Sequence, residues 1–166
     1  RDITDQKAFH QQLAYQAEQY AHGRASGIDN SVSTYGRPIL FHPGTPPAIR
    51  SMKVGRPIPI VVGLSHREGL TASSVAHVAR LRQRSPRVVR RIFEEIDALT
   101  VQGAENLERG ELDRLGEAMN ICQGLLNALQ VSTHELEEMV EISRAHGAAG
   151  AKLTGAGGGG AMIALA

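Results

Sequence analysis

The stretch that decides the fold is Lys152-Leu-Thr-Gly-Ala-Gly-Gly-Gly-Gly160, followed by the apolar run Ala161-Met-Ile-Ala-Leu165. Five of the six residues from Gly155 to Gly160 are glycine. Glycine adopts left-handed backbone angles and lets the backbone approach a ligand closely, so a glycine run between two strand-like segments predicts a tight functional loop. A flexible linker is the alternative reading. The run by itself does not identify a ligand.

The segments upstream of this loop predict an α+β fold. Ile58–Leu64 is a β-branched run and predicts a buried strand, and Ala148–Leu153 predicts a second strand. Four helices are expected between them: Leu70–Arg82, Pro86 to near Gly110, Glu111–Leu129, and Ser132–His146, which begins with the capping box Ser132/Glu135. The order strand, four helices, strand, loop, strand is typical of an α+β domain.

The first third of the chain has a different pattern. Residues Asp5–Ala21 carry apolar side chains at spacings of three and four, which predicts an amphipathic helix. Glycine and proline then interrupt Arg24–Pro47, where we expect a loop followed by a hairpin that includes Ile39–Phe41.

Composition limits the possible functions. The 166 residues are 42% hydrophobic with a formal net charge of +1, which fits a globular protein without a general attraction to nucleic acid. No apolar run approaches the roughly 20 residues of a membrane span, so no membrane partner is expected and a cytoplasmic location is the prediction. Cys122 is the only cysteine, which excludes an internal disulfide and a zinc site made of cysteines. Six arginines without interleaved aromatic residues indicate a solvated surface: Arg80, Arg82, Arg84, Arg87, Arg90 and Arg91.

Several residues near the N-terminus could carry chemistry. Glu18 and His22 are four residues apart on the predicted helix, a spacing that suits metal ligation but also an exposed polar pair. In the turn from His22 to Asn30, two glycines bracket Ser26 and precede Asp29. Asp29 could accept a proton from an alcohol on this loop, or it could bond its own backbone as an ordinary turn residue.

Two motifs resemble those of the mevalonate kinase family in the GHMP kinase superfamily. His22-Gly-x-x-Ser-Gly-Ile-Asp29-Asn30 with Ser31-Val-Ser-Thr-Tyr-Gly36 is similar to the family's central motif. Lys152-Leu-Thr-Gly-Ala-Gly-Gly-Gly-Gly160 is similar to the third motif of the superfamily. The resemblance covers nearly the whole chain and implies the end of a GHMP kinase N-terminal domain over residues 1–56. A ferredoxin-like α+β C-terminal domain would follow over residues 57–166.

The resemblance also implies a reaction and its residues. The family phosphorylates mevalonate to 5-phosphomevalonate with ATP and Mg2+, in isoprenoid precursor synthesis. Asp29 would be the catalytic base or electrostatic anchor, and Glu18 would hold magnesium. His22, Ser26 and Thr34 would line the substrate pocket. The nucleotide-side glycines would be Gly155, Gly157, Gly158 and Gly159, which press backbone toward the transferred phosphate.

The chain departs from the family pattern in ways that bear on activity. The family's glycine- and serine-rich ATP loop and its N-terminal lysine do not occur in these residues, and a further helix and strand usually follow the position of Ala166. We therefore expect a C-terminal fragment, truncated at both ends and inactive alone. Self-association through unpaired edges at Ile58–Leu64 and Gly160–Leu165, or a homodimer, is a further expectation. The alternatives are an inactive scaffold module or a sister kinase acting on phosphomevalonate or a sugar.

Overall fold

A computed structural model describes residues 6, 9–10, 12–16, 26–44, 47–66 and 70–166. The chain divides into two compact units, Arg1–Val54 and Gly55–Ala166, and each is described by itself. Of the helix predicted over Asp5–Ala21, residues 6, 9–10 and 12–16 are described and are helical. Glu18 and His22 lie outside the described residues.

The first unit contains the helix α2 (Ile28–Tyr35) and the strands β1 (Ile39–His42) and β2 (Ala48–Ser51). The two strands pair antiparallel, which confirms the predicted hairpin. The helix is a correction, because a loop was predicted around Asp29. Gly27 and Gly36 both have left-handed angles, with φ of 82° and 60°, and they cap the two ends of α2. Glycines that suggest a turn therefore bound a short helix here.

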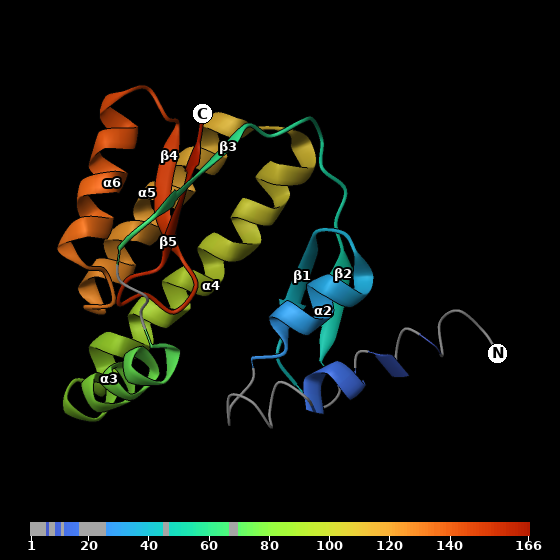
Figure 1. The fold of residues 1–166 in the computed structure, drawn as a ribbon, viewed down its shortest axis with the longest axis horizontal. Coiled ribbons are helices and arrows are strands. Elements are labelled where there is room, and N and C mark those ends of the chain that lie inside the picture. The colour runs from blue at the N-terminus through green and yellow to red at the C-terminus, as the bar shows by residue number, and fades with distance from the viewer. Residues whose placement is uncertain (1–5, 7–8, 11, 17–25, 45–46, 67–69) are drawn as a thin grey trace. The chain divides into compact units, whose positions relative to one another are not determined.

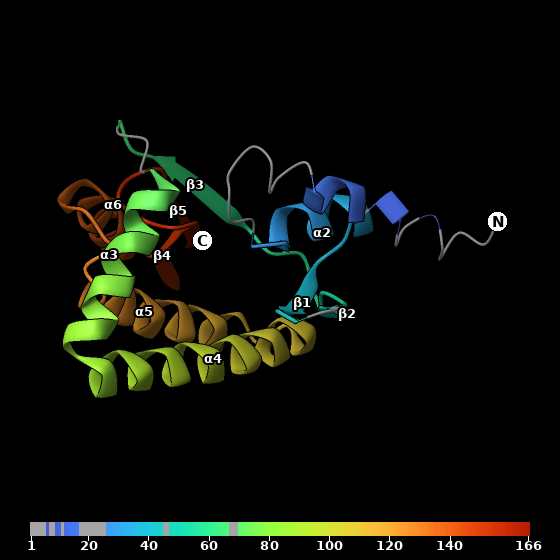
Figure 2. The same ribbon diagram turned by 90° about the horizontal axis from the view of Figure 1, so that it is seen from below.

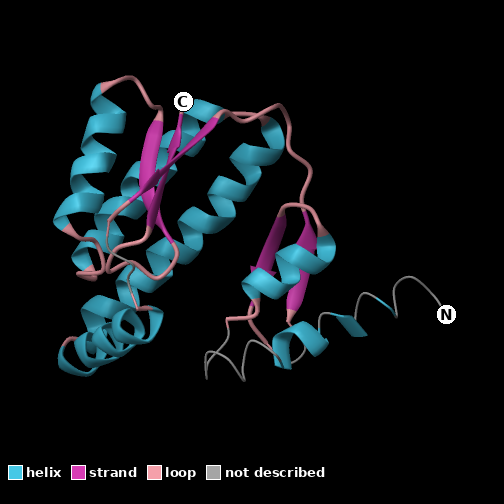
Figure 3. Cartoon of the chain, viewed as in Figure 1, coloured by secondary structure: helices cyan, strands magenta, loops and turns pink. Residues whose placement is uncertain are grey.

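The second unit confirms the predicted order of one strand, four helices, a strand, a loop and a strand (Figure 1). Its elements are β3 (Ile60–Leu64), α3 (Thr71–Arg84), α4 (Pro86–Arg109), α5 (Leu112–Ala128), α6 (His134–Ala145), β4 (Gly150–Thr154) and β5 (Ala161–Leu165). Helices dominate this unit, and its strands form one small sheet (Figure 3). The α+β class is therefore confirmed.

Local sequence signals explain both ends of α4 and the start of α6. Pro86 occupies the first turn of α4, and Gly110 ends the helix with a left-handed φ of 72°. The two-residue connection to α5 makes α4 and α5 an antiparallel pair (Figure 2). The cap of α6 is a correction: the Thr133 hydroxyl, rather than that of Ser132, accepts the hydrogen bond from the Leu136 amide. Ser132 instead accepts a bond from Gln123.

The sheet of the second unit has the order β3-β5-β4, and both pairs are antiparallel. The core packs one face of β4 and β5 against α6 and the α5–α6 connection, through the residues Val89, Leu129, Val131, Leu136, Val140, Ala151, Leu153, Met162 and Ala164. The final strand was expected to expose an unpaired edge. It lies instead at the centre of the sheet, because β3 pairs with it from 97 to 105 residues upstream.

Strand β3 is an edge strand of this sheet, and its predicted burial is wrong. Within the described residues it pairs only with β5. Its apolar side chains are more than half exposed, with Val62 at 59% and Leu64 at 74%. The β-branched pattern that predicts a strand does not by itself tell a buried strand from an uncovered edge.

The opposite edge of the sheet is closed by side chains from α5. The amide group of Asn120 donates to the Ala149 carbonyl at 3.2 Å, and its oxygen accepts from the Ala151 amide at 3.0 Å. The Gln123 oxygen accepts from the Leu153 amide at 2.8 Å. Polar side chains thus replace a neighbouring strand along β4, so further strand pairing is blocked on that side.

Candidate active site

The first part of the candidate site is the N-terminus of α2. Asp29 lies in the first turn of this helix and is exposed to solvent. A carboxylate at this position interacts favourably with the positive end of the helix dipole. Gly27 is buried, and a side-chain carbon built on it would lie 3.3 Å from the ring of Phe41. The close packing of Gly27 on the hairpin therefore fixes where α2 begins and holds Asp29 at its exposed end.

Ser26 and Thr34 lie at opposite ends of the same helix. The Ser26 hydroxyl accepts a hydrogen bond from the Ile28 amide at 3.3 Å, just before the helix. The Thr34 hydroxyl donates to the Asn30 carbonyl one turn earlier, at 2.7 Å. Ser26 therefore lies at the same end of α2 as Asp29 and is exposed like it, whereas Thr34 is half-buried and bonds its own helix.

The predicted metal site cannot be located in the structure. Glu18 and His22, the two residues on which it rests, lie outside the described residues. In the part of the chain that the structure describes, no group of three or more His, Cys, Asp or Glu side chains could hold a metal ion. Asp29 is the one predicted carboxylate whose position is described.

A separate candidate region is the glycine loop, residues Gly155–Gly160, in the second unit. All five of its glycines have left-handed or related angles, with φ of 81°, 75°, 79°, 128° and 88° along the chain. Residues with side chains rarely adopt such angles, so the loop's path requires glycine at these five positions. The loop therefore has one defined path between β4 and β5, as predicted, and is not a linker.

The glycines of this loop differ in their surroundings. Gly155 is exposed, and a side-chain carbon built on it would meet no atom within 4 Å. Gly157 is buried, and the same carbon would collide with the Val131 carbonyl oxygen. The Gly158 amide donates to that oxygen at 2.7 Å. Gly157 and Gly158 thus dock the loop on the α5–α6 connection, and the space around Gly155 is open.

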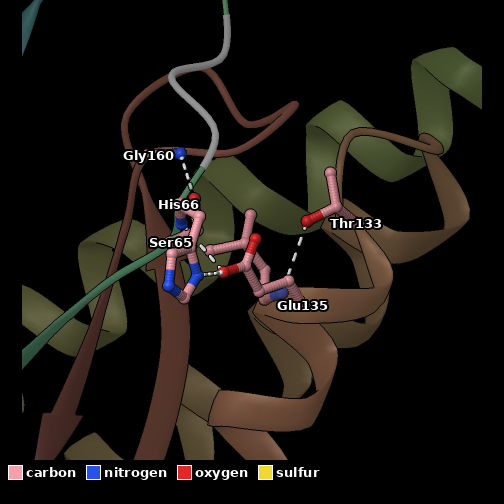
Figure 4. Close-up of polar contacts among 6 residues, drawn as sticks. Ser65, His66, Thr133, Glu135 and Gly160 are labelled. Carbon is pink, nitrogen blue, oxygen red and sulfur yellow. Dashed lines mark hydrogen bonds and ion pairs between the residues drawn. The ribbon is translucent and has the colours of Figure 1, made fainter.

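Polar residues from β3 and α3 also contact the loop. The Ser65 hydroxyl accepts a hydrogen bond from the Gly160 amide at 2.8 Å, and the Ser74 hydroxyl donates to the Gly157 carbonyl at 3.1 Å. Figure 4 shows Ser65 beside Gly160, with the neighbouring His66 turned toward Glu135 at the start of α6. The Glu135 carboxylate lies 2.7 Å from the His66 Nδ1.

Lys152, the first residue of the glycine motif, is half-buried on β4 near Cys122 of α5. Burial lowers the pKa of Lys152 below its ordinary value of 10.5, and the Cys122 thiolate acts in the opposite direction. Burial raises the pKa of Cys122, and the Lys152 charge partly offsets that rise. The Lys152 ammonium donates to the Leu153 carbonyl at 2.7 Å, so the side chain folds back onto its own strand.

Sequence reasoning missed the residues that hold the glycine loop. Ser65 and Ser74 are 95 and 83 residues away from their partners in the loop. Hydroxyl side chains at the end of a strand and in the first turn of a helix are common, so no local pattern distinguishes these two. Contacts of this separation become visible only in the folded chain.

Residues 104–166, which include α5, α6, β4, the glycine loop and β5, match the family described as GHMP kinases C terminal. Residues 104–166 of the second unit thus carry the C-terminal domain of GHMP kinases.

Along most of its length the chain is similar to mevalonate kinases. It is 40% identical over 159 residues to the mevalonate kinase of Thermococcus gammatolerans, covering 93% of this chain and 46% of that protein. The Pyrococcus horikoshii mevalonate kinase is 41% identical, and the match again covers 93% of this chain and 46% of that protein. The L. major mevalonate kinase, solved in complex with R-mevalonate, superposes with a TM-score of 0.86 at 34% identity, over 94% of this chain and 48% of that one.

The chain spans about half the length of the curated relatives it matches. Among the residues that the structure describes, none of the helices has the length and apolar character needed to cross a membrane.

Proposed function

We propose that this chain supplies part of a mevalonate kinase, which phosphorylates mevalonate to 5-phosphomevalonate with ATP. The observation that carries the proposal is the 40% identity to a mevalonate kinase over 93% of the chain, which includes both motifs. In this proposal, residues 1–56 are the end of the N-terminal domain and residues 57–166 belong to the C-terminal domain. The predicted homodimer and cytoplasmic location stay predictions.

Asp29 would act on the hydroxyl of the substrate. Its exposed carboxylate at the start of α2 can accept a proton or anchor the hydroxyl electrostatically. The exposed Ser26 hydroxyl next to it, with His22 and Thr34, would contact the rest of the small alcohol. Phosphoryl transfer depends mostly on positioning and on charge neutralisation, and a well-placed carboxylate at the hydroxyl is one of the parts that it needs.

Magnesium is the ion that the family resemblance implies. Mg2+ prefers carboxylate oxygens and is commonly bound by one or two carboxylates together with substrate phosphates and water. Glu18 would be the ligand, with Asp29 nearby in sequence, and the lack of a larger acidic cluster in the described residues is compatible with this mode of binding. When bound, the ion would neutralise phosphate charge.

The glycine loop would approach the phosphates of ATP. Gly155 has open space around its α-carbon, and Gly158 and Gly159 continue the left-handed path. Gly157 would have an indirect role, because it docks the loop on Val131. The Gly158 amide already donates to the Val131 carbonyl, so the loop would contribute through its shape and its remaining backbone groups.

A chimera tests this proposal. Residues 1–166 would replace the aligned part of the Thermococcus gammatolerans enzyme, and formation of 5-phosphomevalonate from mevalonate and ATP would be measured. We expect turnover by the chimera, and a fall in kcat of about 100-fold or more for Asp29→Asn. Asp113→Asn is the matched control, because Asp113 is also exposed in the first turn of a helix, α5.

Other outcomes would decide between the alternatives. Turnover of phosphomevalonate or a sugar in place of mevalonate would identify a sister kinase. A folded chimera that neither turns over any of these substrates nor binds mevalonate with magnesium would support a scaffold module. Equal rates for the Asp29→Asn and Asp113→Asn variants would remove Asp29 from the catalytic machinery.

A further inference from the structure

We propose that Ser65 and Ser74, at the two ends of the connection between β3 and α3, are positioning residues for the glycine loop. This inference rests on the function proposed above. Ser65 follows β3 directly, and Ser74 lies in the first turn of α3. Both hydroxyls reach the loop, one at Gly160 and the other at Gly157.

Ser65 ends the ladder between β3 and β5 in an unusual way. In a regular antiparallel pair, two facing residues exchange two backbone hydrogen bonds. The Ser65 amide donates to the Gly160 carbonyl at 2.7 Å, as expected for such a pair. The return bond from the Gly160 amide goes to the Ser65 hydroxyl, at 2.8 Å. The side chain thus takes the place of the backbone carbonyl where the glycine loop meets β5.

Ser74 holds the loop at a second point, three residues earlier. Its hydroxyl donates to the Gly157 carbonyl at 3.1 Å from the side of α3. The Val131 carbonyl binds the Gly158 amide from the α5–α6 connection. The segment from Gly157 to Gly160 is therefore attached to three separate parts of the second unit, and two of these attachments are serine hydroxyls.

The residue after Ser65 is attached as well. The Glu135 carboxylate accepts a hydrogen bond from the His66 amide at 2.8 Å and lies 2.7 Å from the His66 ring nitrogen Nδ1 (Figure 4). Glu135 lies in the first turn of α6, whose N-cap is Thr133. This contact attaches the residue after Ser65 to α6. The backbone that carries the Ser65 hydroxyl is therefore held on both sides, by β5 and by α6.

These attachments matter because a glycine-rich segment loses much conformational entropy when it is ordered. Phosphoryl transfer requires the backbone around the phosphate to be positioned closely, and a misplacement of about 1 Å can cost about 100-fold in rate. Loss of one hydroxyl should therefore reduce kcat. The KM for the alcohol should change little, because its proposed contacts His22, Ser26 and Thr34 belong to the first unit.

Kinetics of the chimera test the functional part. We expect kcat to fall about tenfold in Ser65→Ala and in Ser74→Ala, with the KM for mevalonate within about twofold. Ser65→Thr retains a hydroxyl, so its kcat should stay near that of the wild-type chimera. Ser73→Ala is the control, because Ser73 is the exposed neighbour of Ser74 and does not contact the loop in the described structure.

Amide hydrogen exchange of the 166-residue chain tests the structural part independently of activity. Ser65→Ala should speed exchange at the Gly160 amide, Ser65→Thr should restore its protection, and Ser73→Ala should leave it unchanged. Unchanged exchange at Gly160 in Ser65→Ala would overturn the inference, and so would wild-type kcat of both alanine variants in an active chimera. A folded wild-type chimera without kinase activity would instead contradict the proposed function.

Discussion

Gly116 of α5 and Gly150 of β4 pack backbone against backbone: a side-chain carbon built on Gly150 would lie 2.5 Å from the Cα of Gly116. This contact lets α5 approach the edge of β4 closely enough for Asn120 to bind Ala149 and Ala151. Two glycines outside both sequence motifs thus determine how closely α5 approaches the edge of β4.

Gly116→Ala should destabilise the chain. The added methyl group would fall 2.5 Å from the Ala149 carbonyl carbon, and overpacking of this kind costs about 1–3 kcal/mol. Chemical denaturation with urea measures the change. Gly124→Ala on the same helix is the control: no atom lies within 4 Å of its added carbon, so it should be neutral or stabilise by about 0.5–1 kcal/mol. Equal effects of the two substitutions would contradict the close packing.

Within the glycine loop, Gly157→Ala should be more harmful than Gly155→Ala. Both residues have left-handed angles, so both substitutions cost about 1–2 kcal/mol of backbone strain. Only Gly157 would in addition place a carbon against the Val131 carbonyl. Thermal unfolding of the two variants checks the order, and a larger loss of stability for Gly155→Ala would show that the loop is docked differently.

Asn120→Ala should expose the edge of β4. The Asn120 side chain bonds the Ala149 carbonyl and the Ala151 amide, and its oxygen also accepts from the Arg144 guanidinium at 2.7 Å. Loss of these bonds leaves half-buried groups without partners and should cost about 2–3 kcal/mol, with faster exchange of the Ala151 amide. Asn127→Ala, an exposed position on the same helix, should change neither quantity.

The uncovered edge of β3 should cause self-association of the chain. Val62 is 59% exposed on this edge strand, and such edges pair readily with other strands. Val62→Lys should shift sedimentation toward the monomer, because a charge on an edge strand opposes pairing. Val88→Lys is the matched control, since Val88 on α4 is also 59% exposed. A wild-type chain that sediments strictly as a monomer would contradict this prediction.

The pH dependence of Cys122 alkylation should report its pair with Lys152. Burial raises the pKa of this thiol above 9.0, so alkylation by iodoacetamide should reach half its maximal rate above pH 9 in the folded chain. The Lys152 charge partly lowers the pKa of the thiol. Lys152→Met should therefore move the midpoint to still higher pH, whereas Lys53→Met at an exposed site should leave it unchanged. A midpoint that moves to lower pH in Lys152→Met would rule out the interaction.

Much of the second unit could be predicted from sequence because its signals are local. Pro86 and Gly110 bound α4 through their own backbone preferences, and the spacing of apolar residues predicted every helix there. The same local reasoning failed at α2. Gly27 and Gly36 were interpreted as turn residues, although their left-handed angles also cap helices, and only eight residues lie between them.

For the candidate site, too, some features could be predicted from the sequence and others could not. The motif around Asp29 and the glycines from Gly155 to Gly160 were apparent in the sequence, because each is a contiguous run of unusual residues. The attachments of the loop to Ser65 and Ser74 were not, since they join residues 95 and 83 positions apart. The burial of β5 and the exposure of β3 likewise follow from the sheet order, which has no local signature.

The sequence alone therefore determined the order of elements in the second unit, the α+β class and the resemblance to GHMP kinases, because backbone preferences and motifs act over a few residues. Only the tertiary structure decided that β5 is central, that α5 side chains close the edge of β4, and which serines hold the glycine loop. These features depend on which distant segments pack together, and that depends on the burial of apolar surface and the satisfaction of backbone polar groups over the whole unit.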